Sequence, residues 1–272
     1  MYEFNNKLYD NLEGFEFFNV DGVKFAWSPK WKNVGINLSG GADSACLAYT
    51  IAKYIKENNI NCKIHAINFL RCYLTRPWQK HVGLRVYNRL KEMFPDIVIA
   101  RYQTFVPHEI EHSQIGNSIP LADGSKQSGD NVITGSYNRF CASEYNLDCI
   151  FNATTANPPN AGQFRVPERD LIIENCKLAD MLHWTEKHKF YQYRPLMYIR
   201  KDWVYRQYKI NNIMNYYNAT MSCEGDLNCH EPMMAQTTFE DYNEHIDITP
   251  CGECWWCWER KWAEDQYTEK LK

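Results

Sequence analysis

The feature that most constrains the fold is a glycine-rich turn, Leu38-Ser39-Gly40-Gly41-Ala42-Asp43-Ser44, set between two segments of different periodicity. Before it, residues 33–38 place apolar side chains at every second position, which is the period of a strand. After it, residues 43–58 place small and aliphatic side chains on one face at helical spacing. A strand that passes through a glycine turn directly into a helix is typical of α/β proteins. The turn therefore predicts a parallel sheet with helices on its faces.

The same alternation continues along the chain. Residues 62–70 and 96–103 predict further strands, and residues 80–94 between them predict a helix that Pro95 ends. Residues 104–136 predict a long loop, residues 136–145 a helix, and residues 146–154 a strand. Residues 156–170 predict a loop that ends in an acidic helix start. A helix is predicted over 178–189, and a short strand or turn followed by a helix over 194–210. Residues 20–27 predict a turn and a short strand within an N-terminal extension or edge hairpin, residues 1–30.

We therefore divide the chain into an α/β domain over residues 1–210 and a C-terminal region over residues 211–272, where cysteine and tryptophan concentrate. The net charge of -3 argues against a protein built mainly to grip a nucleic acid backbone. The N-terminal sequence lacks the basic start and apolar run of a signal peptide, and no window holds the ~18 apolar residues that span a bilayer. We expect a cytoplasmic protein with no membrane partner, whose eleven cysteines stay reduced.

The turn has the chemistry of an anion-binding loop. Gly40 and Gly41 let the backbone approach an anion closely, and N–H groups of the turn and of the following helix point toward it. Ser39 and Ser44 add hydroxyl donors, while Asp43 stands near the helix start, where a carboxylate can help to hold Mg²⁺. Two familiar phosphate loops are excluded. No lysine follows the glycines as in the P-loop, and the dinucleotide fingerprint Gly-x-Gly-x-x-Gly is absent.

The motif Ser-Gly-Gly-x-Asp-Ser resembles the pyrophosphate-binding loop of the ATP-pyrophosphatase (PP-loop) superfamily. The resemblance implies a doubly wound, mostly parallel five-stranded sheet, with ATP at the carboxyl ends of the strands and split to AMP and pyrophosphate. It implies that ATP is bound by Leu38, Ser39, Gly40, Gly41, Ala42, Asp43 and Ser44. Residues 194–208 resemble the late segment of this superfamily, in which Pro-Leu precedes a lysine at a helix start. That lysine is here Lys201, implied to be catalytic with Asp43 and to reach the ATP phosphates; a surface lysine is the alternative.

Three cysteines near the C-terminus repeat at a fixed spacing, Cys251, Cys254 and Cys257. Cys-x-x-Cys is the usual half of a zinc site, and Zn²⁺ prefers four ligands. Cys223 is the best candidate for the fourth, with Cys229 and His230 as competitors. Four thiolates would make a closed structural site, whereas an open position would admit a catalytic metal or an iron–sulfur cluster.

The tryptophans that interleave with these cysteines have two interpretations. We expect them to pack the cysteine module against the main domain, since large aromatic side chains commonly fill modules with little core of their own. Stacking on a nucleobase is the alternative. These residues are Trp255, Trp256, Trp258 and Trp262.

The loop near the N-terminus, together with Ser-Cys and Cys-Gly-x-Cys-x-x-Cys-x-x-Arg near the C-terminus, resembles the 7-cyano-7-deazaguanine (preQ0) synthase family. The resemblance implies zinc bound by Cys223, Cys251, Cys254 and Cys257, with Arg260 as the trailing arginine. It covers the two ends of the chain and residues 194–208. Residues 68–81 and 151–164 depart from the family pattern, and the spacing from Cys223 to Cys251 is longer than usual.

The resemblance implies an ATP-dependent carbon–nitrogen ligase that uses Mg²⁺. In this family 7-carboxy-7-deazaguanine is adenylated, ammonia gives the amide, and a second activation dehydrates it to the nitrile, as in queuosine biosynthesis and nucleic acid modification. Its partners would be the deazaguanine and ammonia, not nucleic acid directly, and its subunits often pair as a homodimer.

Two alternatives follow from the diverged middle of the chain. One is a related PP-loop enzyme that makes an amide or acts on another base, either a deazaguanine amide or a base in tRNA or DNA. A thiolating enzyme of this kind would need a cysteine near the loop, such as Cys72 or Cys141. The other is a non-catalytic ATP-binding module that kept the loop and the cysteine clamp.

Overall fold

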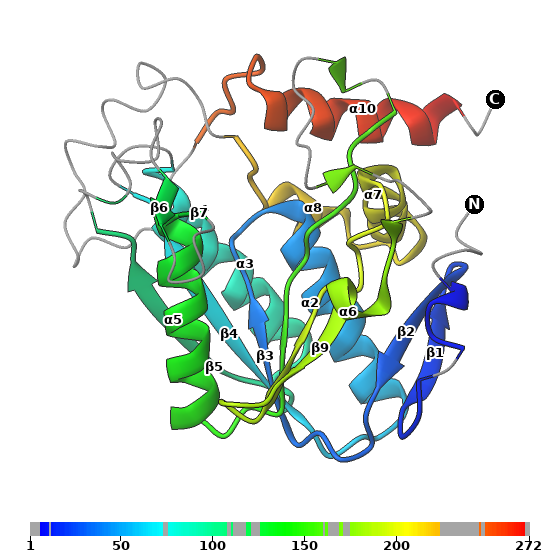
Figure 1. The fold of residues 1–272 in the computed structure, drawn as a ribbon. Helices are drawn as coiled ribbons and strands as arrows, with labels where there is room; N and C mark the ends of the chain where they lie inside the picture. The colour runs from blue at the N-terminus through cyan, green and yellow to red at the C-terminus, as the bar shows by residue number, and fades with distance from the viewer. Residues whose placement is uncertain are drawn as a thin grey trace.

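The fold is built around a six-stranded sheet with helices on both faces (Figure 1). The structure, a computed structural model, describes residues 6–10, 12–72, 76–107, 110, 118–120, 126–159, 161–162, 169–170, 175–223, 245 and 248–269. The strands run in the order β5 (Val98–Phe105), β4 (Lys63–Leu70), β3 (Asn33–Asn37), β8 (Cys149–Phe151), β10 (Phe190–Tyr193) and β9 (Leu182–Thr185). The first five are parallel, and β9 pairs antiparallel with β10 at the edge. The predicted doubly wound, mostly parallel sheet is confirmed, with one antiparallel strand beyond the five predicted.

The order of the strands creates a point where the winding reverses. The chain runs from β3 through α2 (Ala42–Glu57) to β4, and through α3 (Gln79–Met93) to β5. It then returns through α5 (Gly129–Glu144) to β8, on the other side of β3. Open α/β sheets bind ligands where the strand order reverses, at the carboxyl ends of the strands. The fold therefore directs attention to the ends of β3 and β8.

The two faces of the sheet have separate cores because side chains alternate along each strand. Val34 and Ile36 of β3 pack into the large cluster that contains the buried face of α2 and α3. Ile67 and Ile150 point to the other face and pack with Cys141 of α5. The amphipathic pattern that predicts α2 thus buries one face against β3.

Residues 178–189 do not form the predicted helix. Only α6 (Leu178–Met181) is helical, and the chain continues as β9, a turn and β10. The apolar spacing fits one helical turn, but β9 gains a ladder of hydrogen bonds along β10, with Lys189 in the left-handed conformation (φ 56°) at the turn. Pairing at a sheet edge outweighs a weak local helix preference.

The loop predicted over 104–136 is also interrupted. It contains β6 (Ser118–Pro120) and β7 (Lys126–Ser128), which pair antiparallel, and α5 begins within it at Gly129. Strands of three residues are too short to show a period. The acidic helix start predicted near the end of residues 156–170 lies largely outside the described residues.

The N-terminal hairpin is a separate two-stranded sheet and does not extend the main one. β1 (Glu16–Val20) and β2 (Val23–Trp27) are joined by Asp21 and Gly22, both with positive φ (47° and 82°), as a two-residue hairpin turn requires. The Asp21 carboxylate accepts hydrogen bonds from Arg206 and Gln207 of α7 (Lys201–Ile210). The hairpin is thereby fixed to the helix that begins at Lys201.

A buried tyrosine pair also ties the N-terminal segment to the sheet. The Tyr193 hydroxyl accepts the Ala26 N–H at 2.9 Å and lies 2.7 Å from the Tyr9 hydroxyl. We expect Tyr193→Phe to lower the free energy of unfolding by about 1–3 kcal/mol, because it leaves a buried N–H without a partner. Urea denaturation measures this, with Tyr191→Phe in the same strand as the control. Equal stability of Tyr193→Phe and the native protein would contradict it.

The C-terminal helix lies across the carboxyl end of the sheet. α8 (Met214–Asn218) follows α7, and α10 (Trp255–Glu269) packs against α7 (Figure 1). Within the described residues, no helix combines the length and apolar character needed to cross a bilayer.

Candidate active site and cysteine cluster

The glycine turn lies between β3 and α2, and its Ser39 and Gly41 N–H groups donate within the turn to the hydroxyls of Ser44 at 3.2 Å and Ser39 at 3.3 Å. Gly41 precedes α2 in an extended conformation (φ -78°, ψ 158°), and no side chain caps the helix. The Ser44 hydroxyl donates to the Gly41 carbonyl at 3.0 Å and lies 3.0 Å from the Ser39 hydroxyl. Because the first N–H groups of a helix have no partner within it, this N-terminus offers donors and a favourable dipole to a phosphate.

At position 40, only glycine fits without strain. Its φ is +87°, and a Cβ there would lie 3.2 Å from the Gly83 nitrogen and 3.2 Å from Val82 Cγ1, both on α3. Its carbonyl accepts the Met221 N–H at 3.0 Å. The turn is therefore packed backbone to backbone between α3 and the segment that leads to Cys223.

We expect Gly40→Ala to destabilise the fold by about 2–3 kcal/mol, since it adds a steric conflict with α3 to the ~1 kcal/mol cost of a left-handed alanine. Gly14→Ala is the matched control, because Gly14 has φ +76° but nothing within 4 Å of its added Cβ. Denaturant midpoints of the two variants give the difference. If the two variants are destabilised equally, the contact of the added Cβ with α3 does not contribute to the loss of stability.

A pocket of about 280 Å³ opens in front of this turn. It lies where the winding reverses: Asn37 ends β3, Asn152 follows β8, and the Asn37 side-chain amide donates to the Asn152 side-chain oxygen. The pocket is lined by Asn37, Ser39, Gly41, Asp43, Ser44, Arg76, Asn152, Ala153, Thr154, Thr155, Arg169, Lys201, Met221, Ser222 and Trp256. The turn, the start of α7 and the start of α10 thus meet at one place.

A chain of buried charges runs through the wall of the pocket. Lys201 Nζ lies 3.2 Å from Asp43 Oδ2 and 2.7 Å from Glu259 Oε2. The other oxygen of Glu259 accepts a hydrogen bond from Arg169. Lys201 and Glu259 are 3% and 0% exposed, so these ion pairs are shielded from water and are not the weak pairs of a protein surface.

Mutual attraction keeps Lys201 and Glu259 charged despite their burial. Burial favours the neutral amine, but the Asp43 and Glu259 carboxylates outweigh it and raise the pKa of Lys201. Burial likewise favours protonated Glu259, yet Lys201 and Arg169 hold its pKa below the usual value. For Asp43 burial dominates and raises the pKa, against the attraction of Lys201. Of the two carboxylates, Asp43 is therefore the one whose burial is less fully offset by neighbouring positive charge.

The surroundings of Asp43 fit a divalent cation. Its Oδ2 faces Lys201, whereas its Oδ1 is buried with no hydrogen-bond partner in the part of the chain that the structure describes. Mg²⁺ prefers carboxylate oxygens and substrate phosphates as ligands, and both would be available here. The residue predicted to hold Mg²⁺ thus has one oxygen to offer it.

Trp256 brings an aromatic face into the pocket. Three cationic groups lie close to its ring centre: the guanidinium carbons of Arg169 and Arg76 at 5.5 Å and 5.8 Å, and Lys201 Nζ at 5.6 Å. Trp262 instead packs against the main core, as expected. The packing interpretation therefore holds for Trp262, while Trp256 also lines the pocket.

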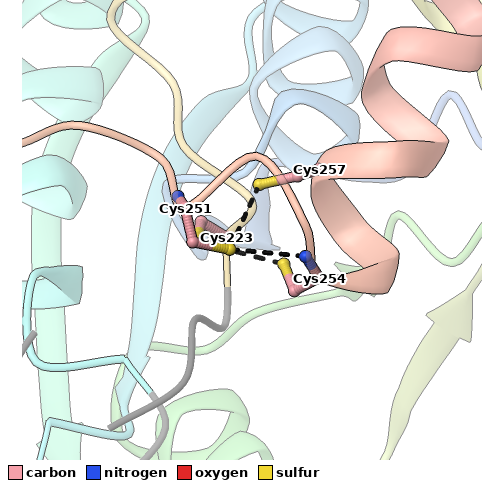
Figure 2. Close-up of side chains that lie close together, drawn as sticks. All are labelled: Cys223, Cys251, Cys254 and Cys257. Atoms are coloured by element: carbon pink, nitrogen blue, oxygen red, sulfur yellow. Dashed lines mark hydrogen bonds between the residues drawn. The ribbon is translucent and has the colours of Figure 1, made fainter. Parts of the chain in front are cut away.

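The four predicted cysteines meet in one cluster (Figure 2). The Cys223 sulfur lies 3.4 Å from that of Cys251 and 3.9 Å from that of Cys254, and the Cys251 and Cys257 sulfurs are 4.0 Å apart. All four sulfurs lie within 4.8 Å of one another. Backbone N–H groups of Cys251 and Cys254 point at sulfurs of the set. The competitors Cys229 and His230 lie outside the described residues.

These distances fit a single tetrahedral ion. Zn–S bonds of about 2.3 Å place the sulfurs of a tetrahedral site about 3.8 Å apart. In a 4Fe-4S cluster each thiolate binds a different iron, which requires a wider spacing. Four sulfurs leave no open position, so this donor set could hold a zinc ion as a closed site.

The cysteine cluster and the pocket share two segments of chain. The first runs from Met221, which bonds to the turn, through Ser222, which lines the pocket, to Cys223. The second is α10, where Trp256 and Glu259 flank Cys257. The predicted trailing residue Arg260 fastens these segments together, donating to the carbonyls of residues 217 and 220.

Sequence reasoning missed Arg169 and Glu259. Arg169 follows a loop without a motif, and Glu259 is one of the unspecified positions of the cysteine motif, between Cys257 and Arg260. Only the tertiary fold brings both side chains together with Lys201. The two cysteines considered for a thiolating activity do not line the pocket. Cys72 is buried, and Cys141 lies on the face of α5 that packs against the sheet, where burial raises the pKa of its thiol to about 11.

No protein-family model and no curated protein matches this sequence. Among solved structures, the chain is similar to the U34-tRNA thiolase NcsA from Methanococcus maripaludis with its 4Fe-4S cluster, at 15% identity and TM-score 0.46, over 98% of this chain and 79% of that chain. It is similar to a phosphoadenylyl-sulfate (PAPS) reductase from Candida auris, in its phosphate complex, at 9% identity and TM-score 0.40, over 73% and 83%. It is similar to NMN synthetase from Francisella tularensis at 15% identity and TM-score 0.43, over 89% and 88%. The three activities differ, so function has to be argued from the residues of this chain.

Proposed function

We propose that this protein is an ATP-dependent enzyme of the PP-loop type, which activates an oxygen of its second substrate by adenylation and releases pyrophosphate. The observation that carries the proposal is the meeting of the Ser39–Ser44 turn, Asp43 and Lys201 at the point where the sheet reverses its winding. N–H groups of the turn and the N-terminus of α2 would bind the pyrophosphate portion of ATP.

The chemistry begins with attack of a substrate carboxylate oxygen on the α-phosphorus of ATP. The new P–O bond forms as the bond to pyrophosphate breaks, and the leaving group takes the electron pair. Donors of the turn, Ser39 and Ser44 hold pyrophosphate where negative charge accumulates, and Lys201 adds positive charge at the rim. Bound Mg²⁺ would supply further charge neutralisation, with Asp43 as its ligand from the protein. Ammonia then attacks the acyl carbon, AMP departs with the C–O electron pair, and the nitrogen loses a proton.

We propose 7-carboxy-7-deazaguanine as the second substrate and 7-cyano-7-deazaguanine as the final product, after a second activation of the amide. Support comes from the combination of the Ser-Gly-Gly-x-Asp-Ser turn with the cluster of four cysteines, and from the Trp256 ring in the pocket, which a planar base can contact.

Incubation of the zinc-loaded protein with ATP, Mg²⁺, ammonia and 7-carboxy-7-deazaguanine, followed by mass spectrometry, tests the proposal. The expected products are the amide, the nitrile, AMP and pyrophosphate. If 7-carboxy-7-deazaguanine gives neither the amide nor the nitrile, but another base stimulates pyrophosphate release, the proposed substrate is wrong and the proposed adenylation still holds. A sulfur-containing product would indicate the thiolating alternative, although no cysteine is among the described residues that line the pocket.

A further inference from the structure

Arg169 is a buried cation that is fixed on one side and unsatisfied on the other. It is 8% exposed. Its Nε donates to the Thr155 carbonyl at 2.6 Å, and its Nη2 donates to the Thr155 hydroxyl at 3.0 Å and to Glu259. Its Nη1 is buried and has no hydrogen-bond partner among the described residues. A buried N–H group without a partner is costly, so an oxygen of a ligand that accepts from this nitrogen would be stabilised there.

The unsatisfied nitrogen belongs to a residue that lines the pocket. The guanidinium lies over the Trp256 ring, which Arg76 and Lys201 also approach. Three positive groups around one ring repel each other. Glu259 pairs with both Lys201 and Arg169, and Asp43 pairs with Lys201. An anion placed beside Arg169 would relieve the repulsion and accept the free N–H bonds.

We propose that Arg169 Nη1 binds an oxyanion of a bound substrate, with Glu259 and Thr155 holding the guanidinium in place. The same chemistry has two sources, the carboxylate of the acceptor and the α-phosphate of the nucleotide. The identity of these two ligands rests on the proposed function; the anion-binding role of Arg169 rests on its own contacts. Arginine suits this task because its guanidinium stays charged and carries several N–H donors, so Nε and Nη2 can bind Thr155 and Glu259 while Nη1 remains available to an oxyanion.

The test compares Arg169→Met and Arg169→Lys with Arg206→Met, in the zinc-loaded full chain. Arg169→Met keeps most of the side-chain volume, and Glu259 retains Lys201 as its partner. Arg169→Lys keeps the charge without the fork and serves as the second variant if the methionine form folds poorly. Arg206→Met removes an arginine–aspartate pair with Asp21, which lies outside the pocket. Circular dichroism and zinc content establish that each variant is folded.

Isothermal titration measures the Kd of three probes: α,β-methylene-ATP with Mg²⁺, 7-carboxy-7-deazaguanine, and its uncharged amide. One charge-assisted hydrogen bond corresponds to about a 10- to 100-fold change in Kd. We expect Arg169→Met to weaken one of the two anionic probes by that factor, Arg169→Lys to weaken the same probe less, and Arg206→Met to leave all three within twofold. Loss confined to the nucleotide identifies the α-phosphate as the source. Loss of the acid with the amide unchanged identifies the acceptor carboxylate.

Each of three results overturns the inference. In folded Arg169→Met, the Kd values of both anionic probes could stay within twofold of native, or the acid and the neutral amide could lose affinity equally while the Kd of the nucleotide is unchanged. In Arg206→Met, the affinities could fall as much as in Arg169→Met. Failure of the proposed function looks different. If the native protein binds no deazaguanine but Arg169→Met still weakens α,β-methylene-ATP, the substrate is wrong and the oxyanion role of Arg169 stands.

Discussion

Replacing Asp43 by alanine is expected to lower ATP-dependent turnover by roughly 100- to 1,000-fold while the metal content stays unchanged. The loss corresponds to removal of one preorganised charge from a site where phosphate charge must be stabilised. Asp43 stands in the first turn of α2, and its Oδ2 faces Lys201. Its Oδ1 is buried and has no hydrogen-bond partner within the described ranges. The variant loses both the proposed Mg²⁺ ligand and the carboxylate that pairs with the Lys201 ammonium.

The fold should tolerate this change, which makes the result interpretable. Lys201 keeps its 2.7 Å ion pair with Glu259, so no unpaired charge is left buried. Pyrophosphate release under saturating ATP measures the rate, and zinc analysis measures the metal. Asp265→Ala is the matched control, because Asp265 pairs with Lys261 on the exposed side of α10. Turnover within tenfold of native would mean that Asp43 does not act on the phosphates.

The parts of the fold that could be predicted are those in which the functional residues lie within one short stretch of sequence that also determines its own secondary structure. β3, the glycine turn and α2 are adjacent in sequence, so a change of period around two glycines was enough to place them. The cysteine run predicts a cluster for the same reason, since Cys-x-x-Cys places two sulfurs on one turn. Cys223 was the best candidate for the fourth member, ahead of Cys229 and His230, and the family resemblance implied the same residue. The structure brings the Cys223 sulfur to 3.4 Å from that of Cys251, while its role as a metal ligand stays a prediction.

What could not be predicted depends on contacts between distant segments. Glu259 is one charged residue in a run of aromatic and charged side chains, and nothing nearby marks it as buried. Its burial follows from the docking of α10 on α7, which places it against Lys201, 58 residues away. Arg169 follows a loop with no periodicity. β9 was predicted as helix because its apolar spacing is ambiguous over four residues and only its partner β10 decides the outcome.

Replacing Cys223 by alanine is expected to remove the metal and to lower the free energy of unfolding by several kcal/mol, because metal binding contributes directly to the stability of such a site. Metal content by mass spectrometry of the native protein and urea unfolding with and without chelator measure the two effects. Cys62→Ala is the matched control, since Cys62 is also buried but lies outside the cluster. Full zinc content in Cys223→Ala would make Cys229 or His230 the fourth ligand.

Cys223→Ala should also lose nucleotide affinity. This result would show that the cysteine cluster supports the pocket as well as the stability of the fold. Cys223 is two residues from Met221, whose N–H bonds to Gly40, and Cys257 holds the end of α10 that carries Trp256 and Glu259. Release of the metal frees both segments, so Glu259 no longer positions Lys201 and Arg169. We expect the Kd of α,β-methylene-ATP to rise at least tenfold at temperatures where the variant is still folded. Unchanged affinity in the metal-free protein would show that α7 and the glycine turn hold the site without the cysteine cluster.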